Sequence, residues 1–283
     1  MKFINKQIES LHDKYVEAIF QVARIEDKGI TFPNTYEIIN DLDKAEKEIP
    51  KRQIDIVLGI KRAYQYVIEI ANSPEAITTR DLQNINKLIN SYETGDLAGS
   101  WRTSTIGIRA TKYIPPIKTS EEYVKLFSEV INKKYGFIDI CKLCGLMTKL
   151  QPFNNGNKRT AICFCNALLV QKDIIPIQVI DYTSYIDKLI NYYEDDDKIN
   201  EYIQFLCKQS NYFGMIDSKL DGNYRNVFGL IKNNPLITKE QIAKILNISE
   251  ATVSRSVACL KEMGYINGKT SNKSGEWIVK KLI

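Results

Sequence analysis

The sequence predicts a mainly α-helical fold, in which a helical bundle is interrupted by one short β-hairpin and followed by a small winged-helix domain of the α+β type. Three observations support this prediction. Apolar residues recur at spacings of three and four through residue 209. Glycines and a proline pair interrupt that spacing around residues 95–116. From residue 222 on, two short helical patterns precede two short strand patterns.

The length of 283 residues is enough for one large domain or two modest ones, and we divide the chain into three regions. Residues 1–48 form an N-terminal region, 49–215 a helical core, and 222–283 a winged helix-turn-helix domain. Hydrophobic residues make up 44% of the chain and charged residues 26%, as in ordinary globular proteins. Because the sequence has neither a run of about 18 apolar residues nor a signal-peptide core, we expect a cytoplasmic protein with no membrane partner.

Three scaffold helices follow from apolar spacing and capping residues. The first is expected over residues 5–24, and it stops near Gly29. The second is expected over residues 51–72. The third runs to about Tyr92 after the capping sequence 78–81. The second and third carry no obvious catalytic side chain, so we interpret them as scaffold.

Residues 95–116 break the helical spacing. β-Branched residues alternate with small ones in this segment, and glycines and the pair Pro115-Pro116 bound it. These features predict a short β-hairpin.

The stretch from Gln151 to Thr160 is the strongest candidate for a functional site. Residues 154–157 read Asn-Asn-Gly-Asn, which is prone to turns and exposes backbone N–H groups. The helix that follows is apolar on almost all sides, so we expect it to be buried and to hold the loop rigidly. Lys158 and Arg159 fall in its first turn, where each cation is unfavourable by roughly 0.3–1 kcal/mol unless an anion binds. The loop is therefore either a phosphate cradle or a solvated loop with two surface cations.

Six cysteines raise the question of a metal site. Cys141 and Cys144, together with Cys163 and Cys165, could supply four thiolates to zinc. However, the first pair belongs to an apolar helical stripe, and the second lies two positions apart in the buried helix, where the side chains point to different sides. We therefore favour buried, reduced thiols. The only histidine of the chain, His12, lies in the polar first helix, and we expect it at the surface.

The motif QPFNNGNKR at residues 151–159 resembles the Fic family motif HPFx(D/E)GNGRxxR, whose members typically transfer AMP from ATP onto protein hydroxyl groups. The agreeing positions are Pro152, Phe153, Gly156, Asn157 and Arg159. The departures are Gln151 for the histidine base, Asn155 for the acidic metal ligand, Lys158 for the second loop glycine and Ile162 for the last arginine. The resemblance implies a Fic-type helical bundle that takes ATP with Mg²⁺.

Each departure has a chemical consequence. An amide at Gln151 accepts no proton at neutral pH, so a general-base contribution of typically about 10²–10⁴-fold is missing. Asn155 offers magnesium one neutral oxygen in place of a carboxylate. Ile162 removes one guanidinium from the phosphate site, and Lys158 compensates in part as a point charge. The resemblance still assigns nucleotide phosphate binding to Phe153, Asn154, Gly156, Asn157, Lys158 and Arg159.

Two further segments resemble parts of Fic proteins. In many of these proteins an inhibitory helix with the pattern (S/T)xxxE(G/N) inserts a glutamate into the nucleotide site. Residues 22–27 resemble this pattern, and the resemblance implies that Glu26 pairs with an arginine; the alternative is a solvated residue at a helix end. The expected hairpin, with Arg102 before it, occupies the place of the flap that pairs with the target protein. That implies target contacts for Thr105, Ile106, Gly107 and Ile108, with a plain structural hairpin as the alternative.

The carboxyl-terminal part of the chain differs in charge. Residues 222–283 contain ten Lys or Arg and four Asp or Glu, a net charge of +6, so the residues before them carry −1. Before this part, helices are expected over 182–193 and 199–209, and the acidic run 194–197 between them is interpreted as a solvated turn rather than a metal site. Residues 238–246, 247–249 and 250–261 predict a helix, a tight turn and a helix.

Together with strands opening near Ile266 and returning at 277–279, and with residues 267–275 as a wing, this pattern resembles a winged helix-turn-helix. Such domains bind DNA, and they also dock proteins or form homodimers. If this one binds DNA, the residue types suited to base edges and phosphates are Ser249, Thr252, Ser254, Arg255, Lys269 and Lys273.

Two functions from different classes follow. In the first, the chain is a Fic-like AMP transferase that binds nucleotide phosphate, has weak or no transfer activity, and is restrained by Glu26. In the second, a catalytically inactive Fic fold acts as a nucleotide-responsive DNA-binding regulator or interaction protein.

Overall fold

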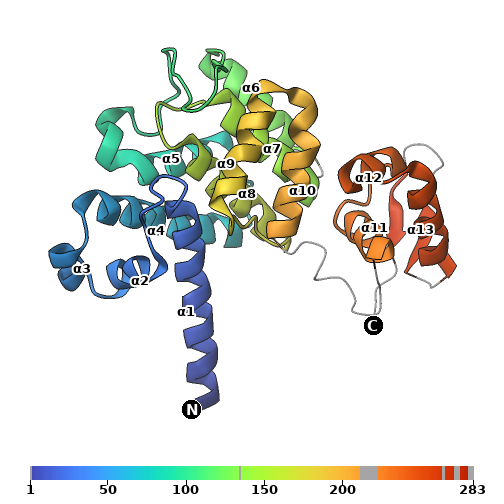
Figure 1. The fold of residues 1–283 in the computed structure, drawn as a ribbon, viewed down its shortest axis with the longest axis horizontal. Coiled ribbons are helices and arrows are strands. Elements are labelled where there is room, and N and C mark those ends of the chain that lie inside the picture. Colours follow the sequence, from blue (N-terminus) through green and yellow to red (C-terminus); the bar gives the residue numbers. More distant parts are fainter. Residues whose placement is uncertain (1, 134, 211–221, 263–264, 271–274, 280–283) are drawn as a thin grey trace.

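The computed structural model describes residues 2–133, 135–210, 222–262, 265–270 and 275–279 (Figure 1). Helices dominate the described residues, and their one sheet is a two-stranded antiparallel pair in the carboxyl-terminal domain. The predicted fold class, a helical bundle followed by a winged helix, is therefore confirmed.

Three helices form the N-terminal region, and they pack on the bundle. They are α1 (Lys2–Ala23), α2 (Phe32–Asn40) and α3 (Leu42–Glu48). The first matches the helix predicted over residues 5–24. Sequence periodicity did not single out α2 and α3 because they span only two or three turns. Side-chain caps start both of them: Thr31 accepts from Asn34 N, and Asp41 accepts from Lys44 N.

The centre of the bundle is α8 (Asn157–Val170), the helix that follows the motif loop. It packs against α4 (Lys51–Asn72), α5 (Thr79–Thr94) and α7 (Phe137–Leu150), and nearly all of its side chains are buried. Thr78 and Asp81 form the expected capping box of α5. The burial of α8 gives the motif loop a rigid support, as the sequence predicts.

Cysteines of the bundle lie in this core. Cys141, Cys144, Cys163, Cys165 and Cys207 are buried and form no disulfide. Burial raises the pKa of Cys163 to about 12, so its thiolate is strongly disfavoured. Within the described ranges no group of three or more His, Cys, Asp or Glu side chains is placed to hold a metal ion. Burial of these five thiols agrees with their interpretation as core residues. His12 contacts Asn40, with Nε2 and Oδ1 separated by 3.0 Å.

Three more helices and two short 3₁₀ turns complete the bundle. They are α6 (Ser120–Ile131), α9 (Tyr182–Glu194), α10 (Ile199–Gln209), η1 (Gly95–Leu97) and η2 (Asp196–Lys198). The last of these covers the second half of the acidic run 194–197, whose aspartates are exposed at the surface, as expected for a solvated turn.

The segment expected to be a β-hairpin is not one. Residues 102–119 are all described, and they contain no strand; the neighbouring Trp101 forms an isolated antiparallel bridge with Phe153 of the motif loop. The chain turns back at Ala110, where φ is 65°. Pro115 and Pro116 lack the N–H groups that a ladder would need. The two arms of the segment, which lie before and after this turn, are held together instead by the side chain of Arg102.

The carboxyl-terminal domain contains α11 (Gly222–Asn233), α12 (Lys239–Leu246), α13 (Glu250–Glu262), β1 (Ile266–Lys269) and β2 (Trp277–Val279). The strands pair Ile266 with Val279 and Lys269 with Trp277. The first strand thus extends three residues into the expected wing. The left-handed Asn247 ends α12 and makes the tight turn before α13. Residues 271–274, and with them Lys273, lie outside the described residues.

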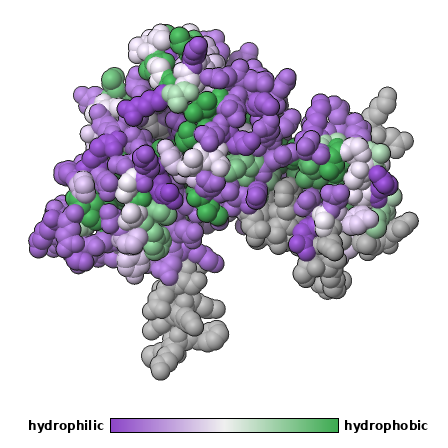
Figure 2. Space-filling model, viewed as in Figure 1, coloured by the Kyte–Doolittle hydropathy of each residue, from purple (hydrophilic) through white to green (hydrophobic). Residues whose placement is uncertain are grey.

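Polar contacts join this domain to the bundle. Asn234 donates to Oδ2 of Asp139 at 3.2 Å, and Gln204 donates to the carbonyl of Lys244 at 3.4 Å. An added Cβ at Gly136 would lie only 2.2 Å from the carbonyl oxygen of Asn233, so the two backbones are in close contact. The face shown in Figure 2 is hydrophilic over most of its area. In the described part of the chain, no helix combines the length and hydropathy needed to cross a membrane.

Candidate functional site

The motif loop connects α7 to α8 through two residues with left-handed backbone. Gln151, with φ 46°, ends α7, and Gly156, with φ 71°, precedes the first residue of α8. An added Cβ at Gly156 would lie 2.2 Å from the amide nitrogen of Asn90. Both the backbone conformation and the close approach of α5 therefore require glycine at this position.

The side chain of Asn157 holds the loop in shape. Its Oδ1 accepts from Phe153 N at 2.9 Å, and its Nδ2 donates to Phe153 O at 2.8 Å and to Gln151 Oε1 at 2.9 Å. Gln151 in turn donates from Nε2 to the carbonyl of Thr148 at 2.6 Å. Both ends of this amide are engaged and neither accepts a proton at neutral pH, so Gln151 is a structural member of the loop.

Phe153 anchors the loop in the core. Its ring is buried and stacks on Trp101, with centroids 5.0 Å apart. Its predicted contact with nucleotide is therefore limited to the backbone. Asn154, by contrast, lies at the cavity described below, together with Gly156 and Asn157.

Arg102 fastens the loop to the arms of the 102–119 segment. Its side chain is 1% exposed, and its guanidinium donates to backbone carbonyls only. Those carbonyls belong to Leu150, Gln151, Ser104, Pro115 and Pro116. A buried arginine with this pattern substitutes for the missing strand pairing.

A cavity of about 160 Å³ opens beside the start of α8. It is lined by Ile25, Glu26, Ile106, Gly107, Gln151 and residues 154–159. Two of the four residues assigned to a target flap, Ile106 and Gly107, thus reach the cavity, whereas Thr105 and Ile108 do not line it. The cavity is smaller than the roughly 300–1,000 Å³ of typical ligand pockets. Glu26 is one of the residues that bound it.

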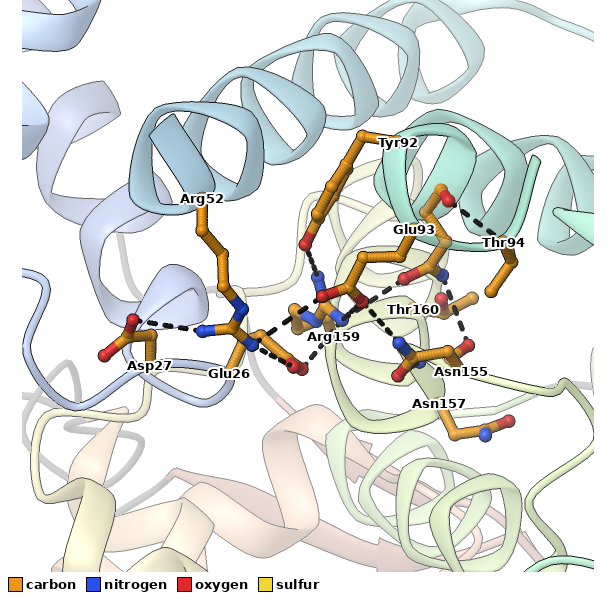
Figure 3. A network of polar contacts seen from close by, with 12 residues as sticks. Glu26, Asp27, Arg52, Tyr92, Glu93, Thr94, Asn155, Asn157, Arg159 and Thr160 are labelled. Atoms are coloured by element: carbon orange, nitrogen blue, oxygen red, sulfur yellow. Dashed lines mark hydrogen bonds and ion pairs between the residues drawn. The ribbon is translucent and has the colours of Figure 1, made fainter. Parts of the chain in front are cut away.

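Arg159 is the central cation of the site (Figure 3). Its side chain is 1% exposed, and Nη2 pairs with Oε2 of Glu26 at 2.7 Å. Nη1 donates to Tyr92 Oη at 3.3 Å, and Nη2 also donates to Asn90 Oδ1 at 3.2 Å. In the described structure Nε has no hydrogen-bond partner. The pairing of Glu26 with an arginine, implied by the resemblance, is thus present.

Lys158 also lines the cavity. It is half-buried, and among the described residues its ammonium makes no hydrogen bond or ion pair. Burial lowers the pKa of Lys158; Glu26 raises it and Arg159 lowers it. A cation of this kind beside a helix N-terminus is stabilised by an anion.

Several residues of the site were missed in the sequence. Arg52 donates to Glu26 Oε1 at 3.2 Å and to Asp27 Oδ2 at 3.1 Å, and Glu93 lies 3.6 Å from Arg52 and 3.8 Å from Arg159. Asn86 and Asn90 of α5 donate to the carbonyl of Asn155. The spacing of Asn86, Asn90 and Glu93 places polar groups on one face of α5. This polar stripe was the sequence signal that could have identified the α5 residues of the site.

The residues at the expected magnesium position only partly suit a cation. Oδ1 of Asn155 accepts from Gly156 N at 2.6 Å, and Nδ2 donates to a carboxylate oxygen of Glu93. Asn155 by itself supplies no negative charge for a hard cation. A carboxylate is nevertheless adjacent, in Glu93.

In the carboxyl-terminal domain, basic side chains from α12 and β1 lie close to each other beside α13. Lys239, at the start of α12, donates to Ser254 Oγ of α13 at 3.2 Å. Burial lowers the pKa of Lys269 on β1, and the nearby Lys239 lowers it further. Arg255 is exposed on α13. Two of the expected DNA contacts, Ser254 and Lys269, therefore lie near Lys239, and Arg255 is exposed at the next position of α13.

Ser249 and Thr252 have local roles at the start of α13. The hydroxyls lie 2.9 Å apart, and Ser249 accepts from Thr252 N at 3.1 Å. Ser249 therefore caps the helix, as the sequence predicts. Thr252 accepts from Arg255 at 3.5 Å.

Comparisons with known proteins agree with this architecture. Residues 76–169 match the Fic/DOC family, and residues 224–273 match a family described as iron dependent repressor, N-terminal DNA binding domain. A curated relative, "Protein adenylyltransferase Fic" of Nematostella vectensis, is 22% identical over 194 residues, which cover 63% of this chain and 44% of that protein. The chain thus spans less than half the length of this relative.

Solved structures share the fold at low sequence identity. Fic-1 of C. elegans is similar with a TM-score of 0.59 at 15% identity, covering 89% of this chain and 64% of that one. A Fic domain containing signaling protein of Bacteroides thetaiotaomicron is similar with a TM-score of 0.58 at 12% identity, covering 86% and 92%. Residues 76–169, which include α8 and its motif loop, thus match the Fic/DOC family, the fold is that of solved Fic structures, and a winged helix-turn-helix follows.

Proposed function

We propose that the Fic domain binds the phosphates of ATP at the start of α8, and that it resembles AMP transferases in its binding step more than in its chemistry. The observation that supports this best is the ion pair between Glu26 and Arg159, at 2.7 Å. A carboxylate of the chain occupies the space beside a buried guanidinium, at a helix N-terminus where an anion is favoured. An unpartnered Nε and the free ammonium of Lys158 are further donors for a phosphate.

Glu26 restrains this site in the proposal. A phosphate and the Glu26 carboxylate compete for the same guanidinium, and the cavity beside them is small. Arg52 holds Glu26 from the other side. Nucleotide binding therefore requires Glu26 to leave Arg159.

Transfer of AMP is weak or absent in this proposal. Gln151 stands where the family has its base, and its amide is engaged by Thr148 and Asn157. The donors around Arg159 still position a phosphate, and positioning contributes much of the acceleration in this class of reaction. We therefore include slow transfer of AMP from ATP onto a protein hydroxyl: the hydroxyl oxygen bonds to the α-phosphorus, pyrophosphate leaves, and the hydroxyl proton passes to water.

Replacing Glu26 with glycine tests this function. We expect Glu26→Gly to bind ATP with Mg²⁺ about 10- to 100-fold more tightly than wild type, because a freed guanidinium forms charge-assisted hydrogen bonds of roughly 1.5–3 kcal/mol each. Calorimetric titration measures the affinity, and intact-mass analysis of the same samples measures AMP addition. Asp27→Asn is the matched control, since Asp27 pairs with Arg52 but does not contact Arg159. Absence of ATP binding in every variant would refute the proposal.

A second function, DNA binding by the carboxyl-terminal domain, is favoured by the basic side chains described above. Lys239, Arg255 and Lys269 come from α12, α13 and β1, and residues 224–273 resemble a DNA-binding domain. The contacts through Asp139 and Gly136 join this domain to α7, the helix that ends at Gln151. We infer that the domain binds duplex DNA and that nucleotide in the Fic site modulates this binding.

Removing single cations of this domain tests DNA binding. Arg255→Ala and Lys239→Ala should weaken retention of duplex DNA, and each should reduce the slope of log affinity against log salt by about 1. Fluorescence anisotropy at several salt concentrations measures both. Lys244→Ala is the control, because Lys244 is equally exposed but pairs with Glu240 at 2.8 Å. If Arg255→Ala and Lys239→Ala retained DNA with the affinity and salt slope of Lys244→Ala and wild type, these residues would not form a DNA site.

A further inference from the structure

The carboxylate that the motif lacks is present next to the motif in space. Position 155 bears an amide where the Fic motif has an acidic residue. In the folded chain, Nδ2 of Asn155 donates directly to a carboxylate oxygen of Glu93, in the last turn of α5 (Figure 3). The two residues are 62 positions apart in the sequence. The negative charge missing at residue 155 is therefore supplied to the same place by another helix.

The two carboxylates around Arg159 are held differently. Glu26 lies 2.7 Å from Arg159 and 3.2 Å from Arg52, which are full charge-assisted contacts. Glu93 lies 3.8 Å from Arg159 and 3.6 Å from Arg52, beyond hydrogen-bond distance of both. Glu93 therefore keeps capacity for another cation, whereas Glu26 is committed to the arginines.

An independent feature indicates where a phosphate would lie. Arg159 is 1% exposed, lines the cavity and leaves its Nε without a partner in the described structure. A buried donor of this kind is stabilised by an anionic oxygen. Asn155 borders the same cavity while it contacts Glu93. A phosphate at Arg159 would thus have the Asn155 amide and the Glu93 carboxylate beside it.

This arrangement suits magnesium more than other metals. Mg²⁺ in nucleotide sites is held by one or two carboxylates together with substrate phosphates and water, rather than by a cage of protein ligands. One carboxylate is sufficient when phosphate and water supply the remaining ligands, and the amide of Asn155, whose Oδ1 accepts from Gly156 N, orients that carboxylate through Nδ2.

We propose that Glu93 replaces the acidic residue of the motif and holds the Mg²⁺ of a bound nucleotide, while Asn155 positions the Glu93 carboxylate through Nδ2. The inference rests on the proposed nucleotide binding of the Fic domain. It divides the two carboxylates by role: Glu26 leaves when nucleotide enters, and Glu93 stays as a metal ligand.

The test removes the carboxylate at position 93 and then introduces one at position 155. In the Glu26→Gly background, ATP is titrated with Mg²⁺ and with EDTA, and the ratio of the two affinities is measured. We expect Mg²⁺ to strengthen binding about tenfold or more, and Glu93→Gln to bring that ratio close to one. Adding Asn155→Asp to Glu93→Gln should restore the ratio, since the charge returns to the motif position. Electron paramagnetic resonance of Mn²⁺ in the presence of ATP gives a second readout without activity.

Controls separate this inference from the function on which it rests. Asp27→Asn removes a carboxylate that contacts Arg52 but not Asn155, and it should keep the Mg²⁺ dependence. Glutamine at position 93 preserves shape and hydrogen bonding, and thermal unfolding checks that the fold is intact. Two outcomes would overturn the metal role of Glu93 without refuting nucleotide binding. One is an unchanged Mg²⁺ dependence of ATP affinity in Glu93→Gln, and the other is a Mg²⁺ dependence that is lost in Glu93→Gln and not restored by adding Asn155→Asp. If Glu26→Gly binds no ATP with or without Mg²⁺, the nucleotide site itself is refuted.

Discussion

Arg159→Ala should abolish measurable ATP binding while the protein stays folded. Arg159 is the buried cation of the cavity, and a phosphate there would replace Glu26 as its partner. Losing at least two charge-assisted hydrogen bonds of roughly 1.5–3 kcal/mol each lowers affinity by about a hundredfold or more. Calorimetric titration of ATP into Glu26→Gly with and without Arg159→Ala measures the effect free of competition from Glu26.

Arg52→Ala is the matched control for this variant. Arg52 also pairs with Glu26, at 3.2 Å, but it does not line the cavity. Its removal loosens Glu26, so in the otherwise wild-type chain ATP should bind more tightly rather than less. Equal ATP affinity before and after Arg159→Ala would mean that phosphate does not bind at the start of α8, and the site would have to be sought elsewhere.

Arg102→Ala should produce the largest loss of stability. The guanidinium is 1% exposed and donates to carbonyls of the motif loop and of both arms of the 102–119 segment. Each buried carbonyl left without a donor costs roughly 1–3 kcal/mol, so we expect the free energy of unfolding to fall by about 3 kcal/mol or more. Denaturant titration followed by circular dichroism measures this loss.

Two further variants make the Arg102 result specific. Arg109→Ala removes an exposed arginine from the same segment and should change the free energy of unfolding by less than about 0.5 kcal/mol. Arg102→Lys keeps the charge but has fewer donors and no planar fork, so it should lie between wild type and alanine. If Arg102→Ala were as stable as Arg109→Ala, the segment and the motif loop would be held by other contacts.

The sequence by itself determined the elements whose information is local. Helices α1, α4 and α5 and the helix-turn-helix follow from apolar spacing and from caps such as Thr78 with Asp81, because these interactions lie within four residues. The motif loop was recognisable for the same reason: residues 151–159 specify its turn and the start of α8. Short helices such as α2 escaped prediction because two turns carry too little periodicity.

Only the tertiary structure decided which distant residues meet at the loop. Glu26, Arg52 and Glu93 come from three separate segments, and packing of α1, α4 and α5 against α8 brings them together around Arg159. The hairpin predicted near residue 105 was wrong. The segment has local β-propensity, but Pro115 and Pro116 lack the N–H groups for strand pairing, and the guanidinium of Arg102 binds the carbonyls of the segment instead. Side-chain hydrogen bonds between residues dozens of positions apart depend on how the helices pack, and no local pattern encodes that.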